Sequence, residues 1–166
     1  RYWASTGSLG RDIVFSEEEF KNGAKLVNKI WNASKFVLSF LENYEPKQTK
    51  LLPMDEWIIA KFNQMQKYFI DYFEKYEIGL AMAELERFFW NFCDNYIEIA
   101  KNRLYKPEIY GESAKESAQF ACFVVLKEML KMFAIYLPHI TEEIYQNYFV
   151  RFENIKSIHN TEISAI

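Results

Sequence analysis

This sequence predicts an all-α fold, an antiparallel helical bundle of four long helices plus a short fifth helix. Apolar residues recur at helical spacings of three and four along most of the chain. Only five glycines and four prolines occur in 166 residues, so turns are few and the helices between them are long. Half of the residues are apolar and 18% are aromatic, which is enough to bury one core. Long helices with short connections pack antiparallel at shallow crossing angles.

The first long helix is expected to begin at Ser16, after a connector formed by residues 1–15. The connector mixes aromatic residues with Ser, Thr and Gly, and we expect at most one turn of helix in it. Ser16 followed three residues later by Glu19 is a capping box, and acidic residues in the first turn favour a helix start. The helix should end near residues 42–44, before a loop at 46–53.

One side of this helix carries the repeat of a buried stripe. Its apolar residues alternate at spacings of four and three. The stripe consists of Phe20, Ala24, Val27, Trp31, Ser34, Leu38 and Leu41, and it is widened by Leu26, Ile30, Val37 and Phe40. We expect this side to face the other helices.

The opposite side of the same helix is basic and carries one aromatic ring. At about 100° per residue, seven of its residues project within about 120° of one another. They are Lys21, Lys25, Asn28, Lys29, Asn32, Lys35 and Phe36. Residues 20–41 contain four lysines and no acid, and removing these four charges from the net charge of −3 leaves −7 for the rest of the chain. Positive charge is therefore concentrated on this side.

This basic side has two interpretations. It is either a solvated lysine surface with Phe36 packed beneath a neighbouring segment, or a platform for single-stranded RNA. In the second case the ammonium groups contact phosphates, the amides contact base edges, and the ring stacks on a base. A membrane-lying helix is disfavoured because its apolar side must cover the other helices. The acidic net charge argues against a generally basic nucleic-acid binder, so we expect neither a membrane nor DNA as a partner.

The rest of the chain predicts four further helices. They span residues 54–75, residues from a tight junction at 76–79 to about 105, residues from a second capping box at Ser113 and Glu116 to the stop at Pro138, and residues 141–149. Pro107 and Gly111 predict a loop before the fourth helix. We expect residues 151–166 to form a tail with little structure of its own.

No arrangement of residues predicts catalysis or a metal site. His139 and His159 have no adjacent nucleophile or orienting group, and we expect His139 to cap or pack at the start of the fifth helix. The sequence contains no HExxH, no CxxC and no acidic calcium loop. Cys93 and Cys122 are therefore expected to be reduced, buried packing residues.

Two carboxylates four residues apart, Asp94 and Glu98, are the nearest approach to an acid and base pair. We expect them instead to pair with Lys101 or Arg103, or to contact another domain. We therefore expect no catalytic residue, no metal and no cofactor in this fragment. The chain has no run of eighteen apolar residues, and its start without methionine suggests a piece of a longer protein.

Five stretches carry a resemblance that spans nearly the whole chain. They are Arg1-Tyr2-Trp3 with Gly10-x-Asp12, the run KLVNKIWNASKF at 25–36, Asp55-x-Trp57-Ile58, the run FWNFCDNYIE at 89–98, and the run LPHITEEI at 137–144. In this order they resemble the helical anticodon-binding domain of class I aminoacyl-tRNA synthetases. The run NKIWNASKF is most similar to the valyl members of that family.

The resemblance implies a longer, cytoplasmic enzyme that activates valine with ATP and magnesium and transfers it to tRNA(Val), while this fragment is itself non-catalytic. Its partners would be the anticodon stem-loop of tRNA(Val) and the catalytic domain of the same chain. The anticodon-binding residues would be Lys25, Asn28, Lys29, Asn32, Lys35 and Phe36, with Phe36 beneath an unstacked base and Lys21 as a further phosphate contact.

The implied domains are a connector to the catalytic part at 1–15, the anticodon-binding bundle at 16–150 and a C-terminal tail at 151–166. Two alternatives stay open. One is the anticodon domain of a sister class I synthetase, isoleucyl, leucyl or methionyl. The other is a helical module that binds another protein through the basic side.

Overall fold

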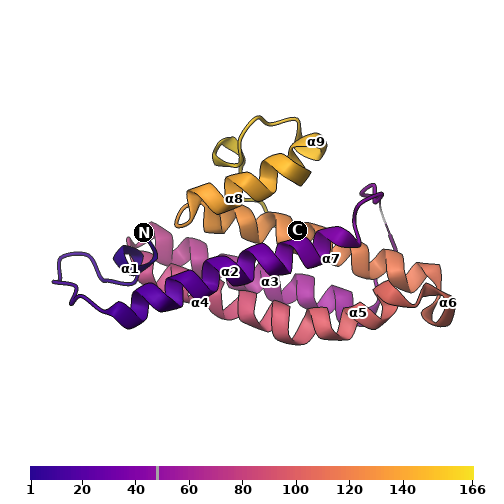
Figure 1. Cartoon of the computed structure of the whole chain (residues 1–166), viewed down its shortest axis with the longest axis horizontal. Coiled ribbons are helices and arrows are strands. Elements are labelled where there is room, and N and C mark those ends of the chain that lie inside the picture. The colour runs from indigo at the N-terminus through magenta and orange to yellow at the C-terminus, as the bar shows by residue number, and fades with distance from the viewer. Residues whose placement is uncertain (48) are drawn as a thin grey trace.

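The computed structural model describes residues 1–47 and 49–166. In these ranges the chain is helical without any strand, and its long helices lie side by side along the longest axis of the molecule (Figure 1). The helices are α1 (Tyr2–Ser5), α2 (Glu17–Ser39), α3 (Pro53–Glu74), α4 (Ile78–Asn91), the π-helix η1 (Phe92–Tyr96), α5 (Ile97–Tyr105), α6 (Pro107–Tyr110), α7 (Glu112–Ala134), α8 (Pro138–Ile144), the π-helix η2 (Tyr145–Phe149), α9 (Val150–Glu153) and the 3-10 helix η3 (Ile158–Asn160). The predicted all-α bundle is confirmed.

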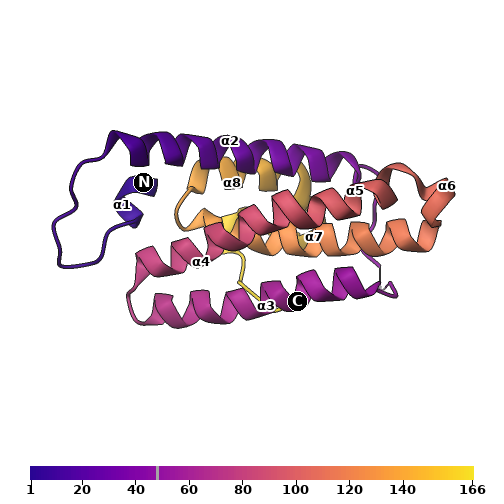
Figure 2. The ribbon, with the colours of Figure 1, turned by 90° about the horizontal axis from the view of Figure 1, so that it is seen from below.

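A continuous helix formed by α4, η1 and α5 runs through the middle of the bundle. Figure 2 shows it between α2 on one side and α3 on the other, with α7 beyond it. It matches the predicted third helix, apart from the π-helical turns at η1. A second continuous helix, formed by α8, η2 and α9, lies over the bundle and contacts α7 and α2 through α8 (Figure 1).

The buried side of α2 differs from the predicted stripe. Its buried residues are Gly23, Leu26, Ile30, Ser34, Val37 and, just past its end, Leu41. Phe20 and Ala24, which were predicted to be buried, are exposed, and Trp31 is only partly buried. The apolar arc of α2 is wide, and its middle rather than one edge faces the bundle. The basic side lies opposite this middle, so most of it is exposed, and only Lys29 and Phe36 at its border are partly buried.

Both ends of α2 are capped. The Ser16 hydroxyl accepts a hydrogen bond from the Glu19 amide at 3.3 Å, as the first capping box predicts. At the other end, side chains distant in sequence donate to successive carbonyls: Gln119 to Phe40 at 2.7 Å, Tyr148 to Leu41, and Arg151 to Glu42 at 3.4 Å. These bonds fix the C-terminal end of α2 to α7 and to the helix formed by α8, η2 and α9.

A buried polar network connects four segments around Asp55. This carboxylate is fully buried and accepts two hydrogen bonds from Arg103, both at 2.7 Å. It also accepts one from the Tyr96 hydroxyl at 2.7 Å and one from the Ser117 hydroxyl. Burial alone would raise the pKa of Asp55, but these four hydrogen bonds lower it below its ordinary value. The network joins α3, η1, α5 and α7.

The prediction of a second capping box at Ser113 and Glu116 is wrong. The chain turns at Gly111, whose φ is 88°, and α7 begins at the next residue, so Ser113 lies inside the helix. Glu116 is therefore free to pair with Lys47, at 2.6 Å, rather than with a helix N-terminus. The loop predicted between Pro107 and Gly111 also contains the single helical turn α6.

The fifth helix is longer than predicted. It begins at Pro138, because a proline at the first position of a helix loses no hydrogen bond, and its helical turns continue to Glu153. Thr141, the predicted start, is buried inside it and donates to the Leu137 carbonyl at 2.9 Å. His139 is exposed and does not cap the helix. The preceding helix, α7, ends at Ala134 rather than at the predicted stop.

The C-terminal segment, residues 154–166, crosses α7 and ends against α3, where Figure 2 places the C-terminus. Ile158 is buried in the core. The Asn63 side chain exchanges two hydrogen bonds with the backbone of Ile166, at 2.8 and 3.0 Å, and Gln66 donates to the Ser164 carbonyl at 3.0 Å. This segment has one 3-10 turn, η3, and is held by these contacts with the helices.

Both cysteines are buried thiols, as predicted. Burial raises the pKa of Cys93 and that of Cys122 to about 12, so neither forms a reactive thiolate. Within the described residues there is no group of His, Cys, Asp or Glu side chains that could hold a metal ion. None of the described helices combines the length and apolar character needed to cross a membrane.

Candidate nucleic-acid interface

The candidate interface is the outward side of α2, and most of its predicted residues are open to solvent. At about 100° per residue, all seven project from one side of α2, within about 120° of one another. The exposed ones are Lys21, Lys25, Asn28, Asn32 and Lys35, and the partly buried ones are Lys29 and Phe36. The structure therefore places every predicted residue on one surface.

The burial of Phe36 is intermediate between the two predicted alternatives, a ring packed beneath a neighbouring segment and a ring open for stacking on a base. Its ring is neither sealed in the core nor freely exposed. It packs at steep angles against Phe40, with ring centroids 5.1 Å apart, and against Tyr105 of α5, with ring centroids 6.3 Å apart. Phe40 and Tyr105 are themselves packed edge to face at 4.7 Å. Phe36 is thus a partly exposed ring at the border of α2 and α5, supported by two aromatic neighbours.

Lys29 is held by groups of the neighbouring helix. Its ammonium group donates to a carboxylate oxygen of Asp94 in η1 at 2.9 Å. It also lies 5.3 Å from the ring centroid of Trp90 in α4, within range of a cation–π contact. The hydrogen bond from Lys29 to Asp94 raises the pKa of the ammonium group above its ordinary value, against a smaller opposing effect of burial. Lys29 is therefore a fixed cation rather than a free one.

The other three lysines differ from Lys29. Within residues 1–47 and 49–166, no ion pair involves Lys21, Lys25 or Lys35. The ammonium group of Lys35 lies 5.9 Å from the ring centroid of Trp31. Three exposed charges along one side of a helix are well placed to contact phosphates of a nucleic-acid backbone.

Three residues that line this surface were not indicated by the spacing of α2. They are Trp90, Asp94 and Tyr105, which come from α4, η1 and α5. The sequence predicted that Asp94 and Glu98 pair with Lys101 or Arg103. Glu98 does pair with Lys101, but Asp94 pairs with Lys29, and Arg103 binds Asp55 instead. Only the packing of α2 against the middle helix brings these groups together.

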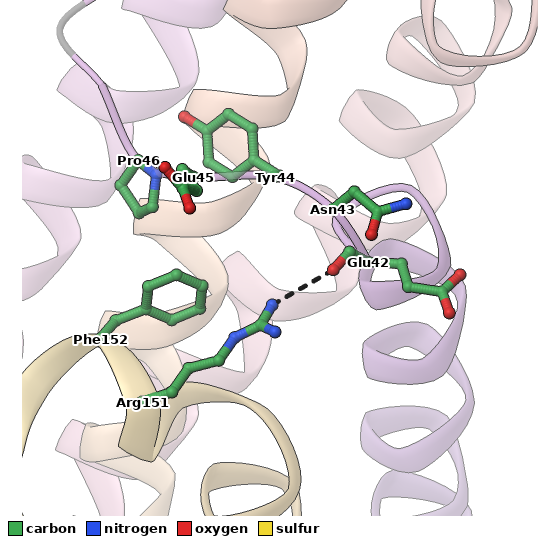
Figure 3. Close-up of a pocket in the computed structure, with 7 residues that line it drawn as sticks. All are labelled: Glu42, Asn43, Tyr44, Glu45, Pro46, Arg151 and Phe152. Atoms are coloured by element: carbon green, nitrogen blue, oxygen red, sulfur yellow. Dashed lines mark hydrogen bonds between the residues drawn. The ribbon is translucent and has the colours of Figure 1, made fainter.

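A separate pocket of about 700 Å³ lies beyond the C-terminal end of α2. Figure 3 shows Arg151 extending from the far wall toward the Glu42 carbonyl, with Phe152 beside it. The Arg151 guanidinium lies 4.6 Å from the ring centroids of both Tyr148 and Phe152. Glu42 and Glu45 also line the pocket, so its charge is not suited to a phosphate group. We assign it to the anchoring of α2.

Comparison with known proteins identifies the family. The family described as the anticodon-binding domain of tRNA ligase matches residues 55–165. The valine–tRNA ligase of Rickettsia felis (strain ATCC VR-1525 / URRWXCal2) is 42% identical over 157 residues, which are 88% of this chain and 18% of that protein. The valine–tRNA ligase of Ehrlichia canis (strain Jake) is 38% identical over 164 residues, which are 97% of this chain and 20% of that protein.

The chain therefore spans about a fifth of the length of these curated relatives. The family match extends from the first turn of α3 to the end of the C-terminal segment, and it includes Trp90, Asp94 and Tyr105. It covers well over half of the chain. The chain belongs to the family of anticodon-binding domains of tRNA ligases.

Proposed function

We propose that this chain is the anticodon-recognition domain of a valine–tRNA ligase, and that it positions tRNA(Val) for aminoacylation by the rest of the enzyme. The observation that carries the proposal is the outward side of α2, which combines exposed lysines, amides and a supported aromatic ring. The names of the relatives support the choice of valine over other amino acids. The full-length enzyme would act in the cytoplasm and use ATP with magnesium.

Within this proposal the residues of α2 have different roles. Lys21, Lys25 and Lys35 contact phosphates and supply affinity that weakens as salt is added. Phe36 stacks against one unpaired base, which is worth about 1 to 3 kcal/mol. The remaining anticodon contacts come from Asn28, Lys29 and Asn32. Asparagine amides carry both donors and acceptors for base edges.

The test uses the intact ligase that contains this chain, with tRNA(Val) as the probe. The variants are Phe36→Leu, which keeps an apolar side chain against Phe40 and Tyr105, and Lys35→Glu. Matched controls on α3 are Tyr68→Leu and Lys67→Glu, since both residues are exposed and lie on a different helix. The measurements are the Kd for tRNA(Val), its salt dependence, and kcat/KM for valine transfer.

Both α2 variants should weaken tRNA binding and lower kcat/KM, while the α3 controls should leave them unchanged. Loss of the stack should cost about 5- to 150-fold in affinity, as expected from 1 to 3 kcal/mol. Lys35→Glu should also flatten the salt dependence. If both α2 variants fold and bind tRNA(Val) as well as the wild type, the assignment of this surface is wrong. Charging with isoleucine, leucine or methionine in place of valine would overturn the choice of amino acid.

A further inference from the structure

We propose that Glu86 is a positioning residue for the ligase reaction. It anchors α1 to the bundle and thereby fixes the orientation of the bundle relative to the part of the enzyme that residues 1–15 connect to it. The inference rests on the proposed function, because it requires that tRNA held on α2 be presented to a catalytic part of the same protein. Glu86 acts through α1 and not by contact with RNA.

The two carboxylate oxygens of Glu86 bind two different elements. One accepts a hydrogen bond from the Tyr2 hydroxyl of α1 at 3.0 Å. The other accepts from the indole nitrogen of Trp90, one turn further along α4, at 3.2 Å. Glu86 is partly buried, and hydrogen bonds to a charged acceptor are stronger than those between neutral groups. Because Trp90 holds the carboxylate on its own helix, the remaining oxygen is presented to Tyr2 in a fixed position.

The position of Tyr2 is also fixed by α2. Gly23 is buried in that helix, and a Cβ added there would lie 2.9 Å from Cδ1 of the Tyr2 ring and 3.0 Å from Tyr2 Cβ. A glycine in the middle of a helix is destabilising relative to alanine, but here it makes room for Tyr2. The Tyr2 side chain therefore occupies a notch on α2 while its hydroxyl reaches Glu86 on α4.

Two further contacts hold the ends of α1, which lies against α2 and α4 (Figure 2). At its start, the Arg1 guanidinium donates to two carbonyls just past the end of α7, both at 3.1 Å. At its end, the Thr6 carbonyl oxygen lies against Gly79, 3.0 Å from the place of an added Cβ. A helix of four residues is not stable by itself in water, so these contacts determine its position. The structure thus makes α1 a rigid junction.

The bond from Tyr2 to Glu86 connects this junction to the helix that borders the candidate RNA surface. Trp90, the second partner of Glu86, lies 5.3 Å from the ammonium group of Lys29 on α2. The same carboxylate therefore holds α1 and orients a ring that supports α2. Without the bond, α1 is free to pivot, and tRNA bound to α2 is presented over a range of angles. A small misplacement of a substrate relative to catalytic groups lowers the reaction rate strongly.

The test uses the intact ligase that contains this chain. The variants are Glu86→Gln, which keeps the size of the side chain, and Tyr2→Phe, which removes only the hydroxyl. Glu84→Gln is the matched control, because Glu84 lies on the same helix and pairs with Arg87 instead. The measurements are kcat and KM for valine transfer to tRNA(Val), and the rate of valine activation without tRNA. The Kd for the anticodon stem-loop is measured with the whole 166-residue chain.

Glu86→Gln and Tyr2→Phe should each lower kcat for valine transfer by about 10- to 100-fold, the scale of loss expected from a misplacement of about 1 Å. Valine activation and the Kd for the stem-loop should stay within about twofold of the wild type, which separates a positioning role from a general loss of folding. The double variant should lose no more than either single variant, because both changes break the same bond. Glu84→Gln should behave as the wild type.

Either of two results would overturn the inference. If Tyr2→Phe transfers valine as fast as the wild type, the bond does not position α1, even where Glu86→Gln is slower or fails to fold. If Glu86→Gln weakens stem-loop binding as much as it lowers kcat/KM, Glu86 supports the RNA surface through Trp90 and not the junction. Phe36→Leu is measured alongside. If it weakens stem-loop binding while Tyr2→Phe leaves kcat unchanged, only this inference fails; if it has no effect on binding, the proposed function fails as well.

Discussion

Asp55→Asn should destabilise the chain by about 3 to 5 kcal/mol, the cost expected when one partner of a buried ion pair is removed. Asp55 is fully buried, and the side chain of Arg103 retains only 10% of its exposure. The carboxylate accepts four hydrogen bonds from Arg103, Tyr96 and Ser117. An asparagine of the same size has a single acceptor oxygen, and its NH2 group would face donors. Arg103 would then stay charged inside the bundle without a counter-ion.

The assay is urea unfolding followed by far-UV circular dichroism at neutral pH, supported by thermal unfolding. For a domain of this size, a loss of 3 to 5 kcal/mol corresponds to a fall in Tm of about 6 to 20 °C.

Asp94→Asn is the matched control, because it breaks an ion pair at the surface and should cost about 1 kcal/mol or less. Arg103 also donates to the Ala114 carbonyl at 3.4 Å. If Asp55→Asn lies within 1 kcal/mol of the wild type, that carbonyl and bound water satisfy Arg103, and the network is not a source of stability.

Three further predictions concern stability. Folding lowers the pKa of Asp55, so the stabilisation from its carboxylate is complete above about pH 4. This stabilisation is lost as the pH falls through the pKa that Asp55 has in the folded chain. Acidification to about pH 3 should therefore reduce the free energy of unfolding more in the wild type than in Asp55→Asn. Tyr148→Phe should cost about 1 kcal/mol in urea unfolding, because it leaves the Leu41 carbonyl at the end of α2 without its donor, and an unchanged midpoint would contradict that role. Removal of residues 163–166 should cost about 2 kcal/mol, because the contacts of Asn63 and Gln66 with this segment are lost, whereas an equal stability would show that the segment is not docked in solution.

Local sequence patterns predicted the elements of the fold well. Apolar spacing and the Ser16 cap indicated α2, and the predicted helix at 54–75 matches α3 to within one residue at each end. The errors arose where two local signals competed. Ser113 and Glu116 satisfy the spacing of a capping box, but Gly111 turns the chain two residues earlier and the helix begins at the next residue, Glu112. Thr141 likewise resembles a helix start, yet Pro138 opens the helix before it.

The candidate site could be predicted only in part, because half of it depends on packing between helices. The seven residues of α2 share a side by helical geometry alone, which is a local property. Asp94 could have paired with Lys101 on its own helix, and nothing in the spacing favoured Lys29, which is 65 residues away. The wide apolar arc of α2 also left its rotation undetermined until the contacts with α7 and α8 were known. The partners Trp90, Asp94 and Tyr105 follow from that rotation.

The central claim is that RNA binds along the outward side of α2, and NMR titration of the ¹⁵N-labelled chain with the anticodon stem-loop of tRNA(Val) tests it most directly. The account predicts that chemical-shift changes concentrate between Lys21 and Phe36 and in η1, fade as salt is raised, and spare α3 and the C-terminal segment. Changes centred on α3 or on the pocket beside Arg151, with α2 unaffected, would contradict it.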